Sequence, residues 1–407
     1  MDGGSARDGA AGDAARADLE TRVRGWLAAL ASHPRGAGTA GEENARALCA
    51  GWLTELGFTV AEHRFTYSRL PGRWGTPVAG IAVAGTMAAS GHLGAWVSPA
   101  SGLAALILMT LLLLVAGRAV ARYGVLHLPF MRSGGVNLLA TTGERASPSL
   151  WLVAHLDSKS QPVSIALRAA GVVGVVVTWL AMAVLLIVGI AGVQIPLVLW
   201  VVATLAGVVA AAPLIASTVG NYSTGALDNA SGVAAVLAAA ALLPADVRAG
   251  VGVAITTGEE LGLAGARAWA AGRTPSIALN CDSVDDEGDW VVMYSGTEPV
   301  PLVDALVGAF RDLPGRAPGQ LRARRLLPGV LTDHLALVDA GWAAVTLSRG
   351  TRATLRRIHT SADNLTLLRG DALLATGEIL ARAAMTLRGT DAARAGHAAG
   401  DGVVQGR

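Results

Sequence analysis

Two adjacent glutamates, Glu259 and Glu260, closely follow an apolar run at residues 250–255 that is typical of a buried strand. Two carboxylates side by side at a strand-to-helix turn repel each other and lose hydration, and a bound cation offsets both costs. Taken alone, the pair is explained equally well as two surface acids on a solvated loop. The other residues of the chain that can do chemistry separate these two interpretations.

Further polar side chains stand at strand ends or in turns. They are His155 after residues 149–154, Asp228 in a turn at 225–232, Asp282 at the end of 277–282, and His359 in the turn after 343–347. Open α/β sheets place their sites at the carboxyl ends of strands. Imidazoles with carboxylates suit zinc, and manganese or cobalt less exclusively. One histidine or acid alone is usually structural or solvated, but six such groups favour a metal site.

The elements that must position these residues alternate between strands and helices. Amphipathic helices are predicted at 17–32 and 42–56, a strand at 58–65, an apolar helix at 233–243 and a closing helix at 372–387. This alternation predicts an α/β fold built on a central sheet.

Four uncharged segments interrupt that pattern, near 74–96, 97–117, 169–191 and 194–217. Each is about long enough to cross a hydrocarbon core of roughly 30 Å. We predict four transmembrane helices in two hairpins, at 74–121 and 169–217. Buried core helices are the alternative, but long uncharged runs in tandem pairs are hard to fit into a soluble core. The mean hydropathy of +0.49 is high for a soluble protein, although alanine and glycine inflate the apolar fraction.

The remaining segments, 17–73, 122–168 and 218–390, are predicted to form one catalytic domain. The head at 1–16 and the tail at 391–407 are predicted to be disordered. A net charge of +2 argues against a role with nucleic acid, and two cysteines make no disulfide framework. No apolar stretch typical of a signal peptide follows the head.

Several segments together resemble the dizinc aminopeptidases of metallopeptidase family twenty-eight, whose relatives include glutamate carboxypeptidases and glutaminyl cyclases. The matching pieces, in the family's order, are 155–158 (HLDS), 225–233 (GALDNASGV), 259–265 (EELGLAG), 280–282 (NCD) and 359–364 (HTSADN). The resemblance covers roughly 17–70 and 135–388. It implies a zinc-exopeptidase, phosphorylase/hydrolase-like fold with a mixed sheet flanked by helices, into which the two hairpins are inserted.

The resemblance also implies roles for these residues. Asp228 would bridge two Zn²⁺ ions and be followed by a cis peptide bond to Asn229. The other ligands would be His155 and Asp282 on one ion, and Glu260 and His359 on the other. Glu259 would not bind metal but would take a proton from the attacking water and deliver it to the leaving amine.

Other residues are expected near this site. Asp157 lies two residues from His155 and is predicted to orient its imidazole. Asp333 and His334 resemble a family segment near the substrate pocket, although surface capping explains them equally well. Lys159, the chain's one lysine, and Arg349 are candidates to neutralise a substrate carboxylate, but solvated faces are the favoured interpretation for both. Cys281 is expected to pack as a small apolar group.

The predicted function is that of a membrane-anchored zinc exopeptidase, and an aminopeptidase is the favoured kind. Its partners are the peptide substrate and the lipid bilayer. No clamp for either peptide terminus is identified, so carboxypeptidase action stays open. One rival is a single-zinc acyltransferase of the glutaminyl cyclase kind, and another is a non-catalytic membrane receptor or scaffold. A transporter has little support, because His92 is almost the only ionisable residue in the spans.

The order of the segments sets the topology. His155 and Asp228 are 73 residues apart, and the second hairpin fills much of this interval. Residues that share a site must lie on one side of the bilayer, so each hairpin must cross an even number of times. The basic residues flank the spans on that side: Arg64, Arg69, Arg73, Arg118, Arg122, Arg132, Lys159 and Arg168. Because the opposite turns, 91–102 and 191–196, carry no lysine or arginine, we predict a multi-pass plasma-membrane protein with a cytoplasmic catalytic domain.

Overall fold

The computed structural model describes residues 3–143, 148–313, 319–327 and 329–401. The chain divides into two compact units. Unit 1 comprises Met1–Phe65, Gly134–Lys159 and Asn221–Arg407, and unit 2 comprises Thr66–Ser133 and Ser160–Gly220.

The centre of unit 1 is an eight-stranded mixed sheet with the strand order β1-β2-β4-β3-β5-β8-β6-β7. The strands are β1 Thr59–Ser68, β2 Arg132–Thr141, β3 Leu150–His155, β4 Val251–Thr256, β5 Ile277–Val284, β6 Asp289–Tyr294, β7 Leu321–Arg325 and β8 Ala343–Gly350. The central strands β4, β3, β5 and β8 run parallel, whereas β2 pairs antiparallel with β4 and β6 antiparallel with β8. The predicted mixed α/β fold is confirmed.

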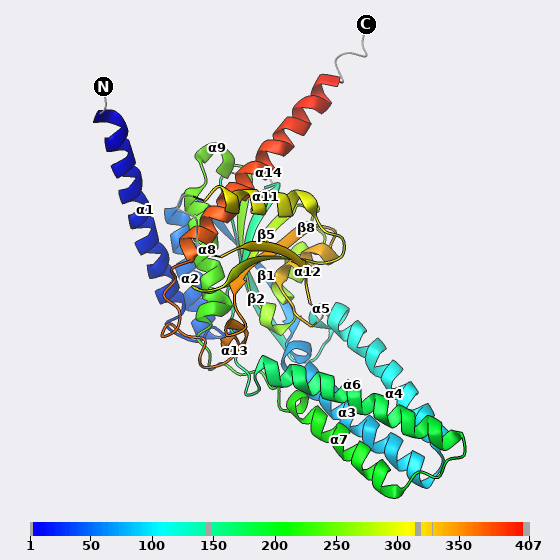
Figure 1. Cartoon of the computed structure of the whole chain (residues 1–407). Helices are drawn as coiled ribbons and strands as arrows, with labels where there is room; N and C mark the ends of the chain where they lie inside the picture. The colour runs from blue at the N-terminus through cyan, green and yellow to red at the C-terminus, as the bar shows by residue number, and fades with distance from the viewer. Residues whose placement is uncertain (1–2, 144–147, 314–318, 328, 402–407) are drawn as a thin grey trace. The chain divides into compact units, whose positions relative to one another are not determined.

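Helices cover both faces of this sheet, as Figure 1 shows. The strands β3 and β4 are buried at every residue, which is why their sequences read as continuous apolar runs rather than alternating ones. The helices of unit 1 are α1 Gly3–Leu30, α2 Ala40–Glu55, α8 Gly232–Leu242, α9 Ala245–Arg248, α10 Ala264–Ala270, α11 Val300–Arg311, α12 Asp333–Asp339, α13 Thr354–Arg357 and α14 Leu373–Asp401. Two short turns of helix, η2 Ala226–Ser231 and η3 Glu259–Leu261, carry candidate site residues.

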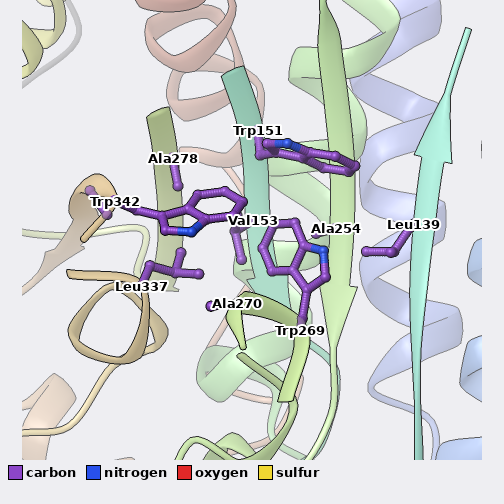
Figure 2. Close-up of a cluster of buried hydrophobic side chains, with 10 residues drawn as sticks. Leu139, Trp151, Val153, Ala254, Trp269, Ala270, Ala278, Leu337 and Trp342 are labelled. Atoms are coloured by element: carbon purple, nitrogen blue, oxygen red, sulfur yellow. The ribbon is translucent and has the colours of Figure 1, made fainter. Parts of the chain in front are cut away.

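Three tryptophans fill the core between the sheet and helices α10 and α12 (Figure 2). The ring of Trp269 lies edge-on to that of Trp151, with the centroids 5.0 Å apart, and 4.9 Å from the ring of Trp342. Rings at these distances combine a large buried apolar area with a favourable edge-to-face geometry. This core fixes α10 against the sheet, and with it the segment that follows β4.

The two ends of the described chain differ from the prediction. Residues 3–16 form the first half of helix α1, and residues 391–401 form the last turns of α14, rather than a disordered head and tail. The high alanine content of both segments favours helix, and Arg16 Nε donates to Glu378 Oε1 of α14 at 2.9 Å. The rest of both predicted segments, residues 1–2 and 402–407, lies outside the described chain.

Unit 2 is a bundle of four long helices (Figure 1): α3 Leu70–Trp96, α4 Pro99–Ala119, α6 Ile165–Ile190 and α7 Leu197–Ile215. After α4 the chain continues through a wide turn, η1 Val120–Gly124, and α5 Val125–His127. All four long helices are long and apolar enough to cross a membrane. Glycines allow close contact, since a Cβ added at Gly91 of α3 would lie 2.1 Å from Thr204 Oγ1 of α7.

Candidate metal centre

The sheet brings the candidate ligands to one edge. His155 ends β3 and pairs in register with Thr256, the last residue of β4. Glu259 and Glu260 therefore lie three and four residues beyond the same edge, in η3. Asp282 lies near the end of β5, the other neighbour of β3. This is the carboxyl edge of the parallel strands, where open α/β sheets place their sites.

Among the described residues, two groups of side chains can each hold a metal ion, and they share Asp228. The first is His155, Asp228 and Asp282, and the second is Asp228, Glu260 and His359; within each group the ligand atoms lie within 4.8 Å of one another. Asp228 faces both groups, because Oδ1 lies 3.2 Å from His155 Nε2 and Oδ2 lies 2.9 Å from His359 Nε2. His359 Nε2 is also 3.2 Å from Glu260 Oε1.

The donor atoms are placed to bind a metal ion rather than to form hydrogen bonds with one another. His155 Nε2 and Glu260 Oε1 are buried, and neither makes a hydrogen bond of ordinary geometry with the described residues. His155 Nδ1 lies 3.0 Å from the carbonyl oxygen of Asp157 and donates to it, which leaves Nε2 as the free lone pair. Two imidazoles and three carboxylates converging in this way match the ligand preferences of zinc. The five residues predicted as ligands are therefore brought together.

The turn that carries Asp228 is tied to β5 by its own side chains. Asn229 Oδ1 accepts from the amide of Ser283 at 3.1 Å, and Asn229 Nδ2 donates to the carbonyl of Cys281 at 3.0 Å. Ser231 Oγ accepts from the amide of Val284 at 2.8 Å. These bonds hold Asp228 close to Asp282. The predicted cis peptide bond between Asp228 and Asn229 is confirmed, and Cys281 is buried as expected.

A buried pair of opposite charges holds the segment 224–228 from its two ends. The guanidinium of Arg35 donates to the carbonyls of Thr224 and Gly225 at 2.5 and 2.9 Å, and also to the carbonyl of Leu156 at 2.9 Å. At the other end, the carboxylate of Asp363 accepts from the amides of Leu227 and Asp228 at 2.6 and 3.2 Å. The guanidinium therefore donates to carbonyl oxygens of this segment, and the carboxylate accepts from its amide groups.

This pair, which we name the Arg35–Asp363 clamp, touches the backbone beside two candidate ligands. Leu156 follows His155, and Gly225 precedes Asp228 by three residues. Burial lowers the pKa of Arg35 to about 10, which still leaves the guanidinium charged at neutral pH. Burial, and then the charge of Asp228, raises the pKa of Asp363 to about 7.

Asp157 acts differently from the prediction. Its backbone carbonyl, rather than its carboxylate, accepts from His155 Nδ1; the nearest carboxylate oxygen is 3.7 Å away. The carboxylate instead accepts from the amides of Glu259 and Glu260, each at 3.2 Å. Asp157 therefore positions the two glutamates as well as the imidazole.

Glu259 lies beside the two ligand groups and belongs to neither. Its side chain is buried. Burial, reinforced by the carboxylates of Glu260 and Asp282 and opposed by His155, raises the pKa of Glu259 well above its usual range. A carboxyl with a raised pKa can both accept and return a proton near neutral pH.

Of two cations expected on solvated faces, Lys159 is partly buried and Arg349 is buried. Lys159 Nζ lies 2.5 Å from Glu260 Oε2, and its side chain is only 16% exposed. The guanidinium of Arg349 lies over the ring of Trp290, 4.1 Å from its centroid, and donates to the carbonyls of Asp285 and Asp286. The solvated interpretation is wrong for both. Lys159 belongs to the candidate centre, whereas Arg349 stabilises the turn between β5 and β6.

Asp333 and His334 are buried at the start of α12 rather than exposed as surface caps. The carboxylate of Asp333 accepts from Thr256 Oγ1 at the end of β4, and burial raises the pKa of Asp333 to about 6. His334 Nδ1 lies 2.7 Å from Thr346 Oγ1, and burial lowers the pKa of His334 to about 4. Both side chains therefore lie in a polar layer beneath the edge that carries His155.

The sequence model of peptidase family M28 matches residues 207–384. The second half of the chain is similar to that family. The matched range contains Asp228, Glu259, Glu260, Asp282 and His359, while His155 precedes it. No curated protein sequence matches the chain.

Solved structures share the fold at low identity. Glutaminyl cyclase from Porphyromonas gingivalis has a TM-score of 0.53 at 14% identity, over 89% of this chain and 96% of that one. The zinc aminopeptidase BSAP from Bacillus subtilis has a TM-score of 0.51 at 14% identity, over 89% and 93%. An aminopeptidase from Aneurinibacillus sp. strain AM-1 has 0.51 at 15% identity, over 89% and 92%. These similarities establish the fold.

Arg35 and Asp363 are absent from the sequence-based prediction of the site, and Asn229 enters it only through the cis peptide bond, without the side-chain bonds that the structure shows. Asn229 and Asp363 lie inside the motifs quoted above, at 225–233 and 359–364, so the motifs themselves carried a signal. Arg35 stands just before the glycine-rich turn at 36–41, where nothing marks it as buried. Its bond to Gly225 spans 190 residues, a distance that no local pattern reveals.

Proposed function

We propose that this protein is a membrane-anchored, zinc-dependent exopeptidase, namely an aminopeptidase that uses two Zn²⁺ ions and Glu259 to activate water. The observation that carries the proposal is the pair of ligand groups that share Asp228, with Glu259 beside both and part of neither. The match to peptidase family M28 supports peptide hydrolysis as the reaction. The fold shared with a zinc aminopeptidase agrees with it.

The residues divide the work as follows. His155 and Asp282 would hold one ion and Glu260 and His359 the other, with Asp228, which belongs to both groups, shared between them. When bound, two such ions polarise the scissile carbonyl and make water a nucleophile at neutral pH.

The proton is moved by Glu259, whose carboxylate takes it from the attacking water and gives it to the leaving amine. The raised pKa of Glu259 suits a group that must hold a proton between these two steps. Asp157 fixes the backbone of Glu259 through the amide that it accepts, so the carboxylate keeps its place relative to the ligands.

The membrane part of the proposal rests on unit 2. Its helices carry large apolar side chains on their outer faces, including Leu108, Leu114, Val173 and Val209, each more than half exposed. An apolar surface of this kind is costly in water and favourable in lipid. The basic residues at the ends of the spans support a cytoplasmic catalytic domain in the plasma membrane. A reporter fused at Gly192 is expected to be active outside the cytoplasm; activity inside it would reverse this orientation.

A single-zinc acyltransferase of the glutaminyl cyclase kind is the second candidate, and one observation favours it. The ammonium of Lys159 lies on Glu260 and supplies positive charge to the second ligand group. If that cation replaces an ion, the protein binds one metal per chain rather than two. Metal stoichiometry therefore separates the two candidates.

The test compares the metal content and the hydrolysis of aminoacyl anilides for the wild type and Glu259→Gln, both in detergent. We expect about two zinc ions per chain in both proteins, and a loss of turnover of about 10²- to 10⁴-fold in the variant. Glu298→Gln, at an exposed acid, is the matched control and should keep full activity. Unchanged hydrolysis by Glu259→Gln, or one zinc per wild-type chain, contradicts the proposal.

A further inference from the structure

Glu259 is carried by a narrow loop, residues 257–265, which runs from the end of β4 to the start of α10. We name this segment the Glu259 loop. Its two ends are joined at the base, because the amide of Gly265 donates to the carbonyl of Thr257 at 2.9 Å. A change in the contacts at this base therefore moves the residues at its tip, among them Glu259.

The conformation of the loop needs support from its neighbours. Gly258, Gly262 and Leu263 have positive φ angles, of 70°, 104° and 61°. Glycine adopts such angles without a steric clash, whereas Leu263 carries a Cβ and pays a free-energy cost for the same conformation. A residue in such a conformation keeps it only where the surrounding structure holds the chain in place.

One side chain from outside the loop connects its two ends. Asn137 of β2 is fully buried. Its Oδ1 accepts from the amide of Thr257 at 3.0 Å, and its Nδ2 donates to the carbonyl of Gly265 at 2.9 Å. The orientation of this side-chain amide is fixed, because its oxygen faces an N–H group and its nitrogen faces a carbonyl. We name this pair of hydrogen bonds the Asn137 bridge.

The register of the sheet brings Asn137 to the base of the loop. β2 runs antiparallel to β4, and Leu138 pairs with Ile255. Asn137 therefore lies one residue beyond that pair, at the carboxyl end of β4, from which its side chain reaches the backbone that follows the strand. Asn137 and Thr257 are 120 residues apart in the sequence, so only the fold reveals the contact.

His63 of β1 holds the same side-chain amide from the opposite side. Its Nδ1 lies 3.3 Å from Asn137 Nδ2 and accepts from it when the ring proton is on Nε2. Burial, and then the charge of Arg273, lowers the pKa of His63, which keeps the imidazole neutral at neutral pH. The amide of Asn137 is therefore held at three points, by β1, by the residue after β4 and by α10.

The missing side chain at Gly265 makes room for the Asn137 bridge. A Cβ at this position would lie 2.3 Å from the carbonyl oxygen of Thr257 and 2.4 Å from Asn137 Oδ1. Both distances are much shorter than a van der Waals contact, so any larger residue would push apart the groups that the bridge joins.

We infer that Asn137 is a positioning residue for Glu259, and that the Asn137 bridge fixes the carboxylate that moves the proton. This inference rests on the function proposed above. A carboxylate that takes a proton from water must lie within hydrogen-bond reach of it. A displacement of about 1 Å at such a group lowers turnover by about 10²-fold.

Glu259 depends on the loop more than its neighbour Glu260 does. The carboxylate of Glu260 has Lys159 and His359 beside it. Glu259 lies outside both ligand groups of the described residues, so the backbone of the loop determines where its carboxylate lies. Asp157 holds that backbone at the tip, through the amide of Glu259, and Asn137 holds it at the base.

The experiment measures anilide hydrolysis by the wild type and Asn137→Ala, as full chains in detergent. We expect kcat to fall by about 10- to 100-fold, while KM and zinc content stay at the wild-type values. A double-mutant cycle then tests whether the effect passes through Glu259. In the Glu259→Gln background, Asn137→Ala should cause little further loss. An equal loss in both backgrounds indicates a general structural defect and overturns the inference.

Gly265→Ala tests the same bridge from α10. Alanine is the better helix former, so the substitution favours α10 itself while its Cβ disturbs the Asn137 bridge. We expect a lower kcat at an unchanged KM, and this variant also supplies the test if Asn137→Ala does not fold. Gly308→Ala in α11 is the matched control, because a Cβ there meets no described atom within 4 Å, and it should keep the wild-type kcat.

A second control separates positioning from loss of stability. Thr376→Val removes another buried hydrogen bond, the one that Trp290 Nε1 donates at 3.0 Å to α14, a helix that carries no candidate ligand. This variant should have a lower melting temperature and the wild-type kcat. A fall of kcat in Thr376→Val as large as that in Asn137→Ala overturns the inference, and so does wild-type kcat in Asn137→Ala or in Gly265→Ala.

The failures of the two proposals are distinguishable. If Glu259→Gln hydrolyses the anilide like the wild type, the proposed function is wrong, and the inference is wrong with it. If Glu259→Gln loses turnover while Asn137→Ala keeps it, only the inference is wrong.

Discussion

Replacing Asp363 by asparagine tests how the turn that carries Asp228 is held. The carboxylate of Asp363 accepts two backbone amides, from Leu227 at 2.6 Å and from Asp228 at 3.2 Å. Asparagine has the same shape but only one oxygen, and its amide group must face one of the two N–H donors. The Arg35–Asp363 clamp then keeps the guanidinium of Arg35 but loses one of the two hydrogen bonds that the carboxylate of Asp363 accepts.

The size of the effect follows from these bonds. A hydrogen bond to a charged group contributes about 1.5–3 kcal/mol. Losing one of the two from the geometry that binds metal costs about 2 kcal/mol, which corresponds to about a 30-fold weaker metal affinity. Residues that support metal ligands from behind typically contribute 10- to 100-fold, so the value lies inside the range known for such partners.

The assay is a competition for zinc between the protein and a chromogenic chelator. It is run at about pH 8, where wild-type Asp363, whose pKa is raised to about 7 by burial and then by Asp228, is mostly ionised. Asp286→Asn is the matched control, because Asp286 also accepts two backbone amides, those of Arg369 and Asp371, on an exposed surface. Wild-type zinc affinity in Asp363→Asn, or an equal loss in Asp286→Asn, would refute the reasoning.

Two further predictions concern buried groups near the centre. Lys159→Gln leaves Glu260 without its cation, and breaking a buried pair costs about 3–5 kcal/mol. Because bound zinc offsets the same charge, the melting temperature of the variant should fall further below that of the wild type in chelator than in zinc. Equal falls in the two conditions would contradict this. His334, whose pKa is lowered by burial to about 4, contributes stability that is present above its unfolded pKa of about 6.5 and is lost as the pH falls through 4. In chelator, the wild type should therefore lose about 3 kcal/mol relative to His334→Asn between these pH values, and parallel pH profiles would be evidence against it.

The grouping of the candidate ligands could be predicted from the sequence because several of them stand at strand ends or in turns, although each one alone is a weak signal. His155 and Asp282 end apolar strands, and parallel neighbours bring their carboxyl ends to one edge. Asp228 stands in a motif whose neighbours Asn229 and Ser231 make the bonds that tie it to β5. Local pattern and long-range contact agree at these positions, so reasoning from strand ends brings these candidate residues to one edge of the sheet.

Buried charges were predicted poorly, for a physical reason. A lysine or arginine is usually solvated, and that expectation was wrong for Lys159 and Arg349. What buries each one is a partner distant in sequence, namely Glu260 for Lys159 and the Trp290 ring for Arg349. A composition rich in alanine and glycine likewise predicted disorder at 3–16, where the contact of Arg16 with Glu378 in α14 supports a helix.

The inserted helices leave the metal centre intact because each insertion closes at its neck. The second one begins and ends with Ser160 and Gly220, whose amides and carbonyls bond to each other at 3.1 and 2.8 Å. The first is closed by the amide of Arg69, which donates to the carbonyl of Met131 at 3.0 Å. A chain that leaves and returns through one pair of residues adds a pair of long helices without moving its ends apart. His155 and Asp228 can therefore lie 3.2 Å apart although 73 residues separate them. On the membrane anchoring proposed above, a single added span would place them on opposite sides of the bilayer, so that proposal requires insertions between the candidate ligands to come as hairpins.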